Sequence, residues 1–177
     1  PLLKFSIKIN IIWANTMENS DSYFSDYLKD GTPGEKFVYK AELQKSFIEN
    51  DHQLNISDQL HAEQEAIRSG PQVDNNPALT ESDLIESSPI KQANLVGNYI
   101  ENNDITLSDV SNADNQALIH DSSDLNYMQE SFSAGEEFIR DTNLTESYLE
   151  NGEVNAIDEI NAENTAFAEG STLDYLF

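Results

Sequence analysis

Apolar and polar residues alternate along the first part of the chain. Apolar side chains occupy every second position from Leu3 to Trp13, with mostly polar ones between them. Successive side chains of a β-strand point to opposite faces, so the alternation predicts a strand with one apolar face. Two other interpretations stay open. In the first, the mature protein starts at Met17. In the second, residues 1–16 are a clipped secretory leader, which would make the protein secreted.

The rest of the chain carries an internal repeat. Residues 128–166 align with residues 79–117 without a gap, with 13 identities in 39 positions. A third copy begins at residue 34, where GEKFVYKAELQKSFIEN resembles the GEEFIRDTNLTESYLEN that begins at residue 135. Self-similarity at a fixed spacing is typical of repeat proteins, in which neighbouring copies stack to bury a shared core.

Each copy has the hydrophobic spacing of two helices joined by a turn. The first arm is short (residues 43–49, 95–101 and 144–150), with a Leu and, four residues later, an aromatic on the same face. Asn143 and Glu146 have the spacing of a capping box in the last copy. The second arm is longer, and its buried stripe is predicted to consist of Ile56, Leu60 and Ile67; Leu107, Val110 and Ala117 or Leu118; Ala156, Ile160 and Phe167.

These patterns predict a mostly α-helical chain of degenerate, loosely packed hairpin repeats of about fifty residues, behind the strand-like segment. The alternative is a largely disordered acidic chain. The predicted organisation is a lead-in at residues 1–33, three copies at 34–76, 77–126 and 127–174, and the start of a truncated further copy at 175–177. The chain would then be a segment of a longer array.

The acidic composition narrows the choice of partners. The 177 residues have a formal net charge of -24, and residues 69–177 hold 22 of the 33 acids but only two cations. A negative field repels nucleic acid and anionic membranes, and it attracts basic proteins and divalent cations. We therefore expect a basic protein partner, no nucleic-acid binding and, at most, weak and diffuse Ca²⁺ binding. No apolar run is long enough for a membrane-spanning helix.

The sequence lacks the motifs of enzymes and cofactor sites. It has no cysteine, no glycine-rich phosphate loop and no zinc-protease or serine-hydrolase motif, and its three histidines share no spacing. Residues 104–114 offer oxygen ligands but lack the central Gly and terminal Glu of an EF-hand loop. We therefore expect no enzymatic activity, no cofactor and no specific metal site.

A repeated aromatic followed by an acid is the best candidate for a binding site. The aromatics are Phe47, Tyr99 and Tyr148, and the acids two residues later are Glu49, Glu101 and Glu150. One hypothesis is a docking motif that a non-enzymatic interaction or scaffold segment of a larger protein presents several times. A second is that the aromatics pack the two arms together. A third is an acidic decoy or chaperone, a DNA mimic that binds a basic protein through charge.

Overall fold

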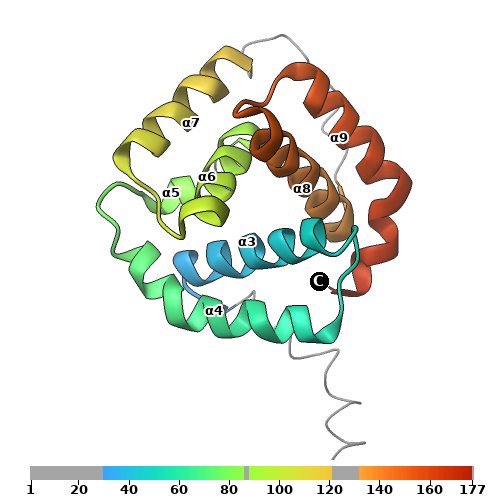
Figure 1. Ribbon diagram of the computed structural model, residues 1–177, viewed down its shortest axis with the longest axis horizontal. Helices are drawn as coiled ribbons and strands as arrows, with labels where there is room; N and C mark the ends of the chain where they lie inside the picture. The colour runs from blue at the N-terminus through green and yellow to red at the C-terminus, as the bar shows by residue number, and fades with distance from the viewer. Residues whose placement is uncertain (1–29, 86–87, 121–131, 177) are drawn as a thin grey trace, which may run out of the picture.

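A computed structural model of the protein confirms that the chain is mostly α-helical (Figure 1). The structure describes residues 30–85, 88–120 and 132–176. A 3-10 helix, η1 (Gly170–Leu176), ends this part of the chain. The α-helices are α3 (Pro33–Glu49), α4 (Ile56–Asp74), α5 (Glu81–Ile85), α6 (Pro89–Asn102), α7 (Leu107–His120), α8 (Ala134–Asn151) and α9 (Ala156–Glu169). The predicted N-terminal strand lies outside the described residues.

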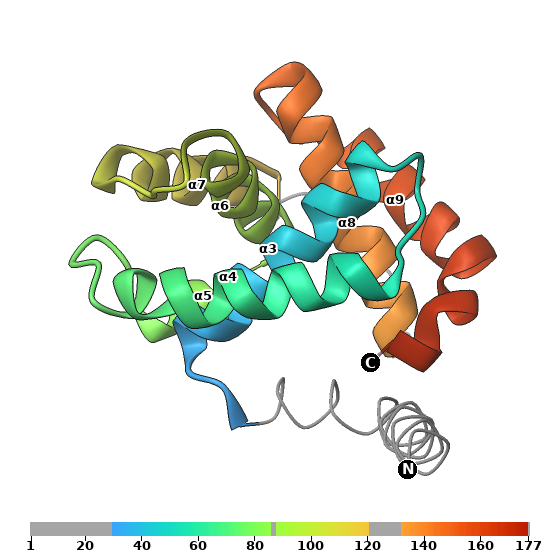
Figure 2. The same ribbon diagram turned by 60° about the horizontal axis from the view of Figure 1, so that its bottom comes forward.

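The longer helices pair into three hairpins, each with a first and a second arm. Hairpin 1 is α3 with α4, hairpin 2 is α6 with α7, and hairpin 3 is α8 with α9. The first arms form an inner triangle in Figure 1, and the second arms lie outside it. Figure 2 shows from a second direction that α4 runs beside α3.

Polar caps start the first arms. The Thr32 side chain accepts a hydrogen bond from the Glu35 amide, and the Glu35 carboxylate accepts one from the Thr32 amide. Ser133 and Glu136 make the same exchange at the start of α8. Each exchange satisfies two amides that would otherwise lack partners, and this fixes where the helix begins.

The prediction of short first arms is therefore wrong. The first arms begin at Pro33, Pro89 and Ala134, well before the predicted residues 43, 95 and 144. Asn143 does not cap a helix. It lies inside α8, where its side-chain amide donates to the Ile139 carbonyl at 2.8 Å.

The turn between the arms closes on the repeated aromatic in all three hairpins. A residue with positive φ after each first arm donates its amide to the carbonyl of that aromatic, and it directly caps α6 and α8. These donor–acceptor pairs are His52 with Phe47 (2.9 Å), Asn103 with Tyr99 (2.7 Å) and Gly152 with Tyr148 (2.7 Å). Hairpin 1 has one more residue in this turn, because Asn50, with φ of -105°, caps α3 before Asp51 and His52 adopt positive φ. A reciprocal cap then starts each second arm, between Asn55 and Asp58, Thr106 and Asp109, and Asn155 and Asp158.

Large side chains of the first arms pack against alanines of the second arms. Buried first-arm side chains include Tyr39, Leu43, Ile90, Leu95, Phe138 and Leu144. The second arms contribute alanine pairs one turn apart: Ala62 and Ala66, Ala113 and Ala117, Ala162 and Ala166. Small side chains on one helix let the other approach closely, so the core has one large layer and one small layer.

The predicted stripe of the second arms is therefore largely wrong. Val110 and Ala117 are buried, as expected. The other large members face outward and are 37–72% exposed: Ile56, Leu60, Ile67, Leu107, Leu118, Ile160 and Phe167.

Glycines let the two arms touch at the open end of hairpin 1. A Cβ added to Gly34 would lie 2.4 Å from the Gly70 carbonyl oxygen, so only glycine fits there. The Gly34 amide donates to Asp74 Oδ1 at 2.7 Å, which ties the start of α3 to the end of α4. The corresponding residues of hairpin 3 are Gly135, Gly170 and Asp174, and there η1 folds back against α8.

Candidate protein-binding surface

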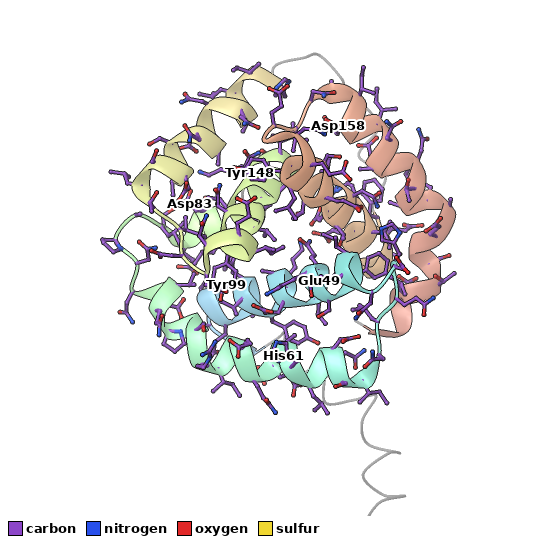
Figure 3. All side chains as sticks on the ribbon, in the orientation of Figure 1. Glu49, His61, Asp83, Tyr99, Tyr148 and Asp158 are labelled. Atoms are coloured by element: carbon purple, nitrogen blue, oxygen red, sulfur yellow. The ribbon has the colours of Figure 1, made fainter. Side chains whose placement is uncertain are left out.

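The three aromatics of the predicted docking motif are wholly or partly buried, and Figure 3 labels two of them, Tyr99 and Tyr148. Phe47 and Tyr99 are only 4% and 3% exposed, and Tyr148 is half-buried. Burial raises the pKa of both tyrosine hydroxyls, so these stay neutral at physiological pH. In this conformation the aromatics contact the protein itself.

Two of these aromatics join α3 to the other first arms. Phe47 meets Phe138 of α8 edge to face, with ring centroids 5.6 Å apart and an interplanar angle of 86°. Tyr99 of α6 meets Phe37 of α3 in the same way, at 5.8 Å and 81°. Edge-to-face pairs of this kind add about 0.5–1.5 kcal/mol to the free energy gained by burial alone.

The third aromatic joins α8 to α6. The Tyr148 ring lies so close to Gly97 that a Cβ there would come within 2.3 Å of Cδ1. The Tyr148 hydroxyl accepts a hydrogen bond from Asn98 Nδ2 at 3.0 Å. The end of each first arm thus contacts the next first arm, α3 to α8, α8 to α6 and α6 to α3, and the three hairpins close into a ring.

The acids of the predicted motif lie apart from the aromatics, on the surface. Glu49, Glu101 and Glu150 are exposed and stand in the last turn of the first arms. The last turn carries the negative end of the helix dipole, where an acid is unfavourable by about 0.3–1 kcal/mol. These acids therefore do not stabilise the helices that carry them.

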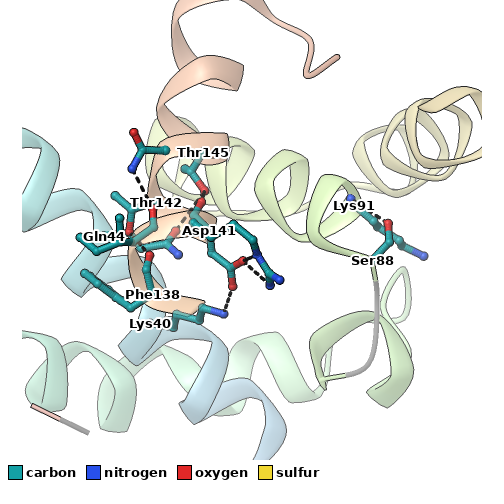
Figure 4. A network of polar contacts seen from close by, with 11 residues as sticks. Lys40, Gln44, Ser88, Lys91, Phe138, Asp141, Thr142 and Thr145 are labelled. Atoms are coloured by element: carbon teal, nitrogen blue, oxygen red, sulfur yellow. Dashed lines mark hydrogen bonds and ion pairs between the residues drawn. The ribbon is translucent and has the colours of Figure 1, made fainter. Parts of the chain in front are cut away.

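An ion cluster around the buried Asp141 joins α3 to α8 (Figure 4). Lys40 Nζ donates to Asp141 Oδ2, and Arg140 Nε and Nη2 donate to Oδ1 at 3.0 and 2.8 Å. Burial alone would raise the pKa of Asp141, but the two cations outweigh burial and hold it below its ordinary value. In the same interface the Thr145 hydroxyl lies 3.0 Å from Gln44 Oε1.

A second ion cluster joins α5, α6 and α7. Lys91 Nζ lies 2.5 Å from a carboxylate oxygen of Asp83 and 2.5 Å from one of Asp114. Burial opposes the charge on Lys91, but its bonds to the two carboxylates raise its pKa. Burial likewise opposes the charge on Asp83, whose bonds to Lys91 and Thr80 hold its pKa below the ordinary value. The cluster therefore stays ionised and holds hairpin 2 together.

The hollow beside Tyr99 is too small for a substrate. It is lined by residues that include Ser69, Asn76 and Ile105, and its volume is about 30 Å³. This is the volume of about one water molecule, whereas ligand pockets measure about 300–1,000 Å³. Nowhere in residues 30–85, 88–120 and 132–176 do three or more His, Cys, Asp or Glu side chains gather as metal ligands would.

The large exposed apolar side chains gather on the second arms. Among the residues that the structure describes, ten large apolar side chains are exposed; nine of them lie on α4, α7 and α9, and the tenth is Ile85. At 3.6 residues per turn, seven of the nine lie within about 40° of one another around their helices. We name them the second-arm stripes: Ile56, Leu60 and Ile67 on α4; Leu107 and Leu118 on α7; Ile160 and Phe167 on α9.

The sequence held a signal that would have found these stripes. Alanines four residues apart recur at matching places in all three second arms. Because alanines can form the buried face of a helix that packs closely on another, the larger residues beside them are free to face outward. The prediction from hydrophobic spacing assigned the largest apolar side chains to the buried face, and so it chose the wrong face of each second arm.

None of the helices in the described ranges is long and apolar enough to span a membrane. Comparison of the chain with protein families, curated proteins and solved structures found no match.

Proposed function

We propose that the chain is a non-enzymatic, acidic protein-binding module made of three copies of one helical hairpin. Its partner is a basic protein that docks on the second-arm stripes. The observation that carries this proposal is that nine of the ten large apolar side chains exposed in the described part of the chain lie on α4, α7 and α9. Large apolar side chains that are left exposed along one face of a helix are candidates for an interaction site, whereas singly scattered exposed residues need no explanation.

The matching construction of the three hairpins supports the repeat. Each closes its turn with an amide that donates to the carbonyl of its aromatic, and each has a reciprocal cap and a buried alanine pair, although the turn of hairpin 1 has one more residue. Hairpin 2 departs from the others at its open end, because α6 begins about one turn later than α8 on the sequence alignment. Three copies would present three related stripes to one partner.

The expected strength of a single stripe is small. Full burial of an Ile, Leu or Phe is worth about 1.5–3 kcal/mol. Because the stripe residues are already about half-buried, covering each would return about 1 kcal/mol. A stripe of two or three residues would then give a dissociation constant no better than about millimolar. Useful affinity requires several stripes together, with help from charge.

The net charge of -24 favours a basic partner. Opposite charge speeds encounter and suppresses wrong partners. The same charge supports the alternative function, an acidic decoy or chaperone that mimics DNA. That alternative needs the acids but has no use for exposed aliphatic side chains, so removing the stripes distinguishes the two.

In this proposal the residues of the aromatic–acidic motif do not dock the partner directly. Phe47, Tyr99 and Tyr148 join the hairpins, and Glu49, Glu101 and Glu150 add to the acidic surface. Direct docking through the aromatics would require the ring of hairpins to open.

The test uses an amphipathic helical peptide of Leu and Lys with a fluorescent label. We expect its anisotropy to report binding to the intact chain, and expect the triple variant Ile67→Ser, Leu118→Ser, Phe167→Ser to weaken binding at least tenfold. The helix content of the variant should not change, because these side chains lie outside the core.

The matched control is Ile85→Ser, which removes an exposed aliphatic outside the stripes. It should bind the peptide as the parent does. If the triple variant also binds as the parent does, and affinity follows only salt concentration, the stripes are not the docking surface and the decoy function is favoured.

A further inference from the structure

Each second arm carries an acid at the same place between its apolar residues. The acids are Glu63 on α4, Asp114 on α7 and Glu163 on α9. Glu63 and Asp114 stand seven residues after the first residue of their stripes, and Glu163 stands three residues after Ile160; each acid is four residues before the last stripe residue, which is Ile67, Leu118 or Phe167. Residues three, four and seven apart share a helix face, so each acid lies on the same face as its stripe.

Only one of the three acids has a cationic partner among the described residues. Asp114 is bound by Lys91, whose Nζ lies 2.5 Å from its carboxylate. Neither Glu63 nor Glu163 forms an ion pair or a side-chain hydrogen bond within the described part of the chain. Both are partly buried. Burial raises the pKa of Glu63, as expected for a carboxylate that its apolar neighbours partly shield from water.

An unpaired carboxylate within an apolar stripe restricts what can cover it. A wholly apolar occupant would strip water from the carboxylate without replacing its hydrogen bonds, which is strongly unfavourable. An ammonium or guanidinium group with apolar residues on both sides would replace them with charge-assisted bonds. A second copy of this chain would place acid against acid, given its net charge of -24.

We propose that Glu63 and Glu163 select the partner. Each pairs with a lysine or arginine of the basic amphipathic helix that covers its own stripe, on α4 for Glu63 and on α9 for Glu163. The α7 stripe does not make this selection, because Lys91 already occupies Asp114. The site is thus one cation-selective stripe on α4, a second on α9 and a stripe on α7 without that preference. Figure 1 shows α4 and α9 on two different sides of the ring.

This inference rests on the proposed function, since it assumes that the stripes dock a protein. It adds that the carboxylates of Glu63 and Glu163 distinguish one partner from another, and that they recognise a lysine or arginine of the partner. It also predicts which hairpins discriminate, although all three carry an acid at the same position.

The experiment compares two labelled peptides, the Leu and Lys helix and the same helix with Gln at every Lys. The test variant of the whole chain is Glu63→Gln with Glu163→Gln. The matched control is Asp114→Asn with Glu101→Gln, which removes the same total charge from a paired acid and from an exposed acid outside the stripes. Lys91 keeps Asp83 as a partner in the control, so hairpin 2 should stay folded.

We expect the test variant to bind the Lys peptide about tenfold more weakly or worse, and to lose most of the preference for Lys over Gln. The control should stay within about twofold of the parent. Equal losses in test and control variants would overturn the inference, because total charge would then decide affinity.

The same measurements separate this inference from the proposed function. If the Ser variants of the stripes lose binding but Glu63→Gln with Glu163→Gln does not, the stripes dock the partner and the two acids do not select it. If neither set loses binding, both proposals fail.

Discussion

The first and second arms of the hairpins place their hydrophobic residues in opposite ways. The first arms bury their large side chains, such as Phe138 and Leu95, which are 2% or less exposed. The second arms bury alanines and leave residues such as Ile67 and Phe167 about half in water. Folding alone does not require large apolar side chains on an outer face. The contrast indicates that the first arms hold the fold together and that the second arms are available for contact with other molecules.

The largest expected difference between the arms comes from removing one phenylalanine from each. Phe138→Ala should lower the free energy of unfolding by about 3–5 kcal/mol, because it empties the interface with Phe47. Phe167→Ala should lower it by no more than about 1 kcal/mol, since Phe167 is 46% exposed and its clearest contact is a stack on Phe132. Urea unfolding followed by circular dichroism measures both. Equal losses would contradict the division between the arms.

The buried charge of a first arm should matter nearly as much. Asp141→Asn leaves the partly exposed Lys40 and Arg140 without their buried anion, and the loss of these charge-assisted hydrogen bonds should lower the free energy of unfolding by about 2–3 kcal/mol at pH 7. Because its pKa is lowered in the fold, Asp141 stabilises the protein above the unfolded value of about 3.9. That contribution is lost as the pH falls through the folded value. The difference between parent and variant should therefore shrink below about pH 4.

Glu42→Gln is the matched control for the loss of a buried carboxylate. Burial raises the pKa of Glu42 despite the opposing charge of Lys45, and no Lys or Arg of the described residues forms an ion pair with it. A raised pKa means that the fold disfavours the ionised form, so this group's stabilising contribution is lost as pH rises through the folded value. At pH 7 the Gln variant should be as stable as the parent or slightly more stable. A loss as large as that of Asp141→Asn would show that any buried acid is needed here.

The smallest predicted effect compares the two faces of one second arm. Ala113→Leu adds bulk where α7 meets the core and should lower the free energy of unfolding by about 1–3 kcal/mol. Ser111→Leu adds the same side chain at an exposed position that matches Leu60 and Ile160. It should change stability by less than about 0.5 kcal/mol and extend the α7 stripe. Thermal melts of the two variants decide whether the faces differ in this way.

The sequence predicted the helical class and the location of the turns, because both depend on local chemistry. Asn103 and Gly152 follow the repeated Tyr-x-Glu-Asn and adopt positive φ, as residues of their type do readily. It did not predict where the first arms begin. Thr32-Pro33-Gly34-Glu35 has the composition of a turn, but Pro at the first helical position and Glu three residues after Thr also start a helix.

The sequence also misplaced the candidate site, for a reason that lies in tertiary structure. Phe47, Tyr99 and Tyr148 stand at matching places in the sequence, yet a matching place does not say whether a residue faces another hairpin or the solvent. Only the closure of the hairpins places these rings inside. The partnering of Asp114 by Lys91 likewise joins α6 to α7 and has no signature in local spacing.

The closed ring of first arms has a consequence for how the molecule loses its structure. In an open stack of repeats, the outermost unit is held on one side only and can unfold while the rest persists. Here each hairpin is held by both of the others, so none has a free end from which melting can start. Loss of one hairpin would break two of the three junctions at once. The ring should therefore melt in a single all-or-none transition, with coincident changes at Tyr99 and Tyr148.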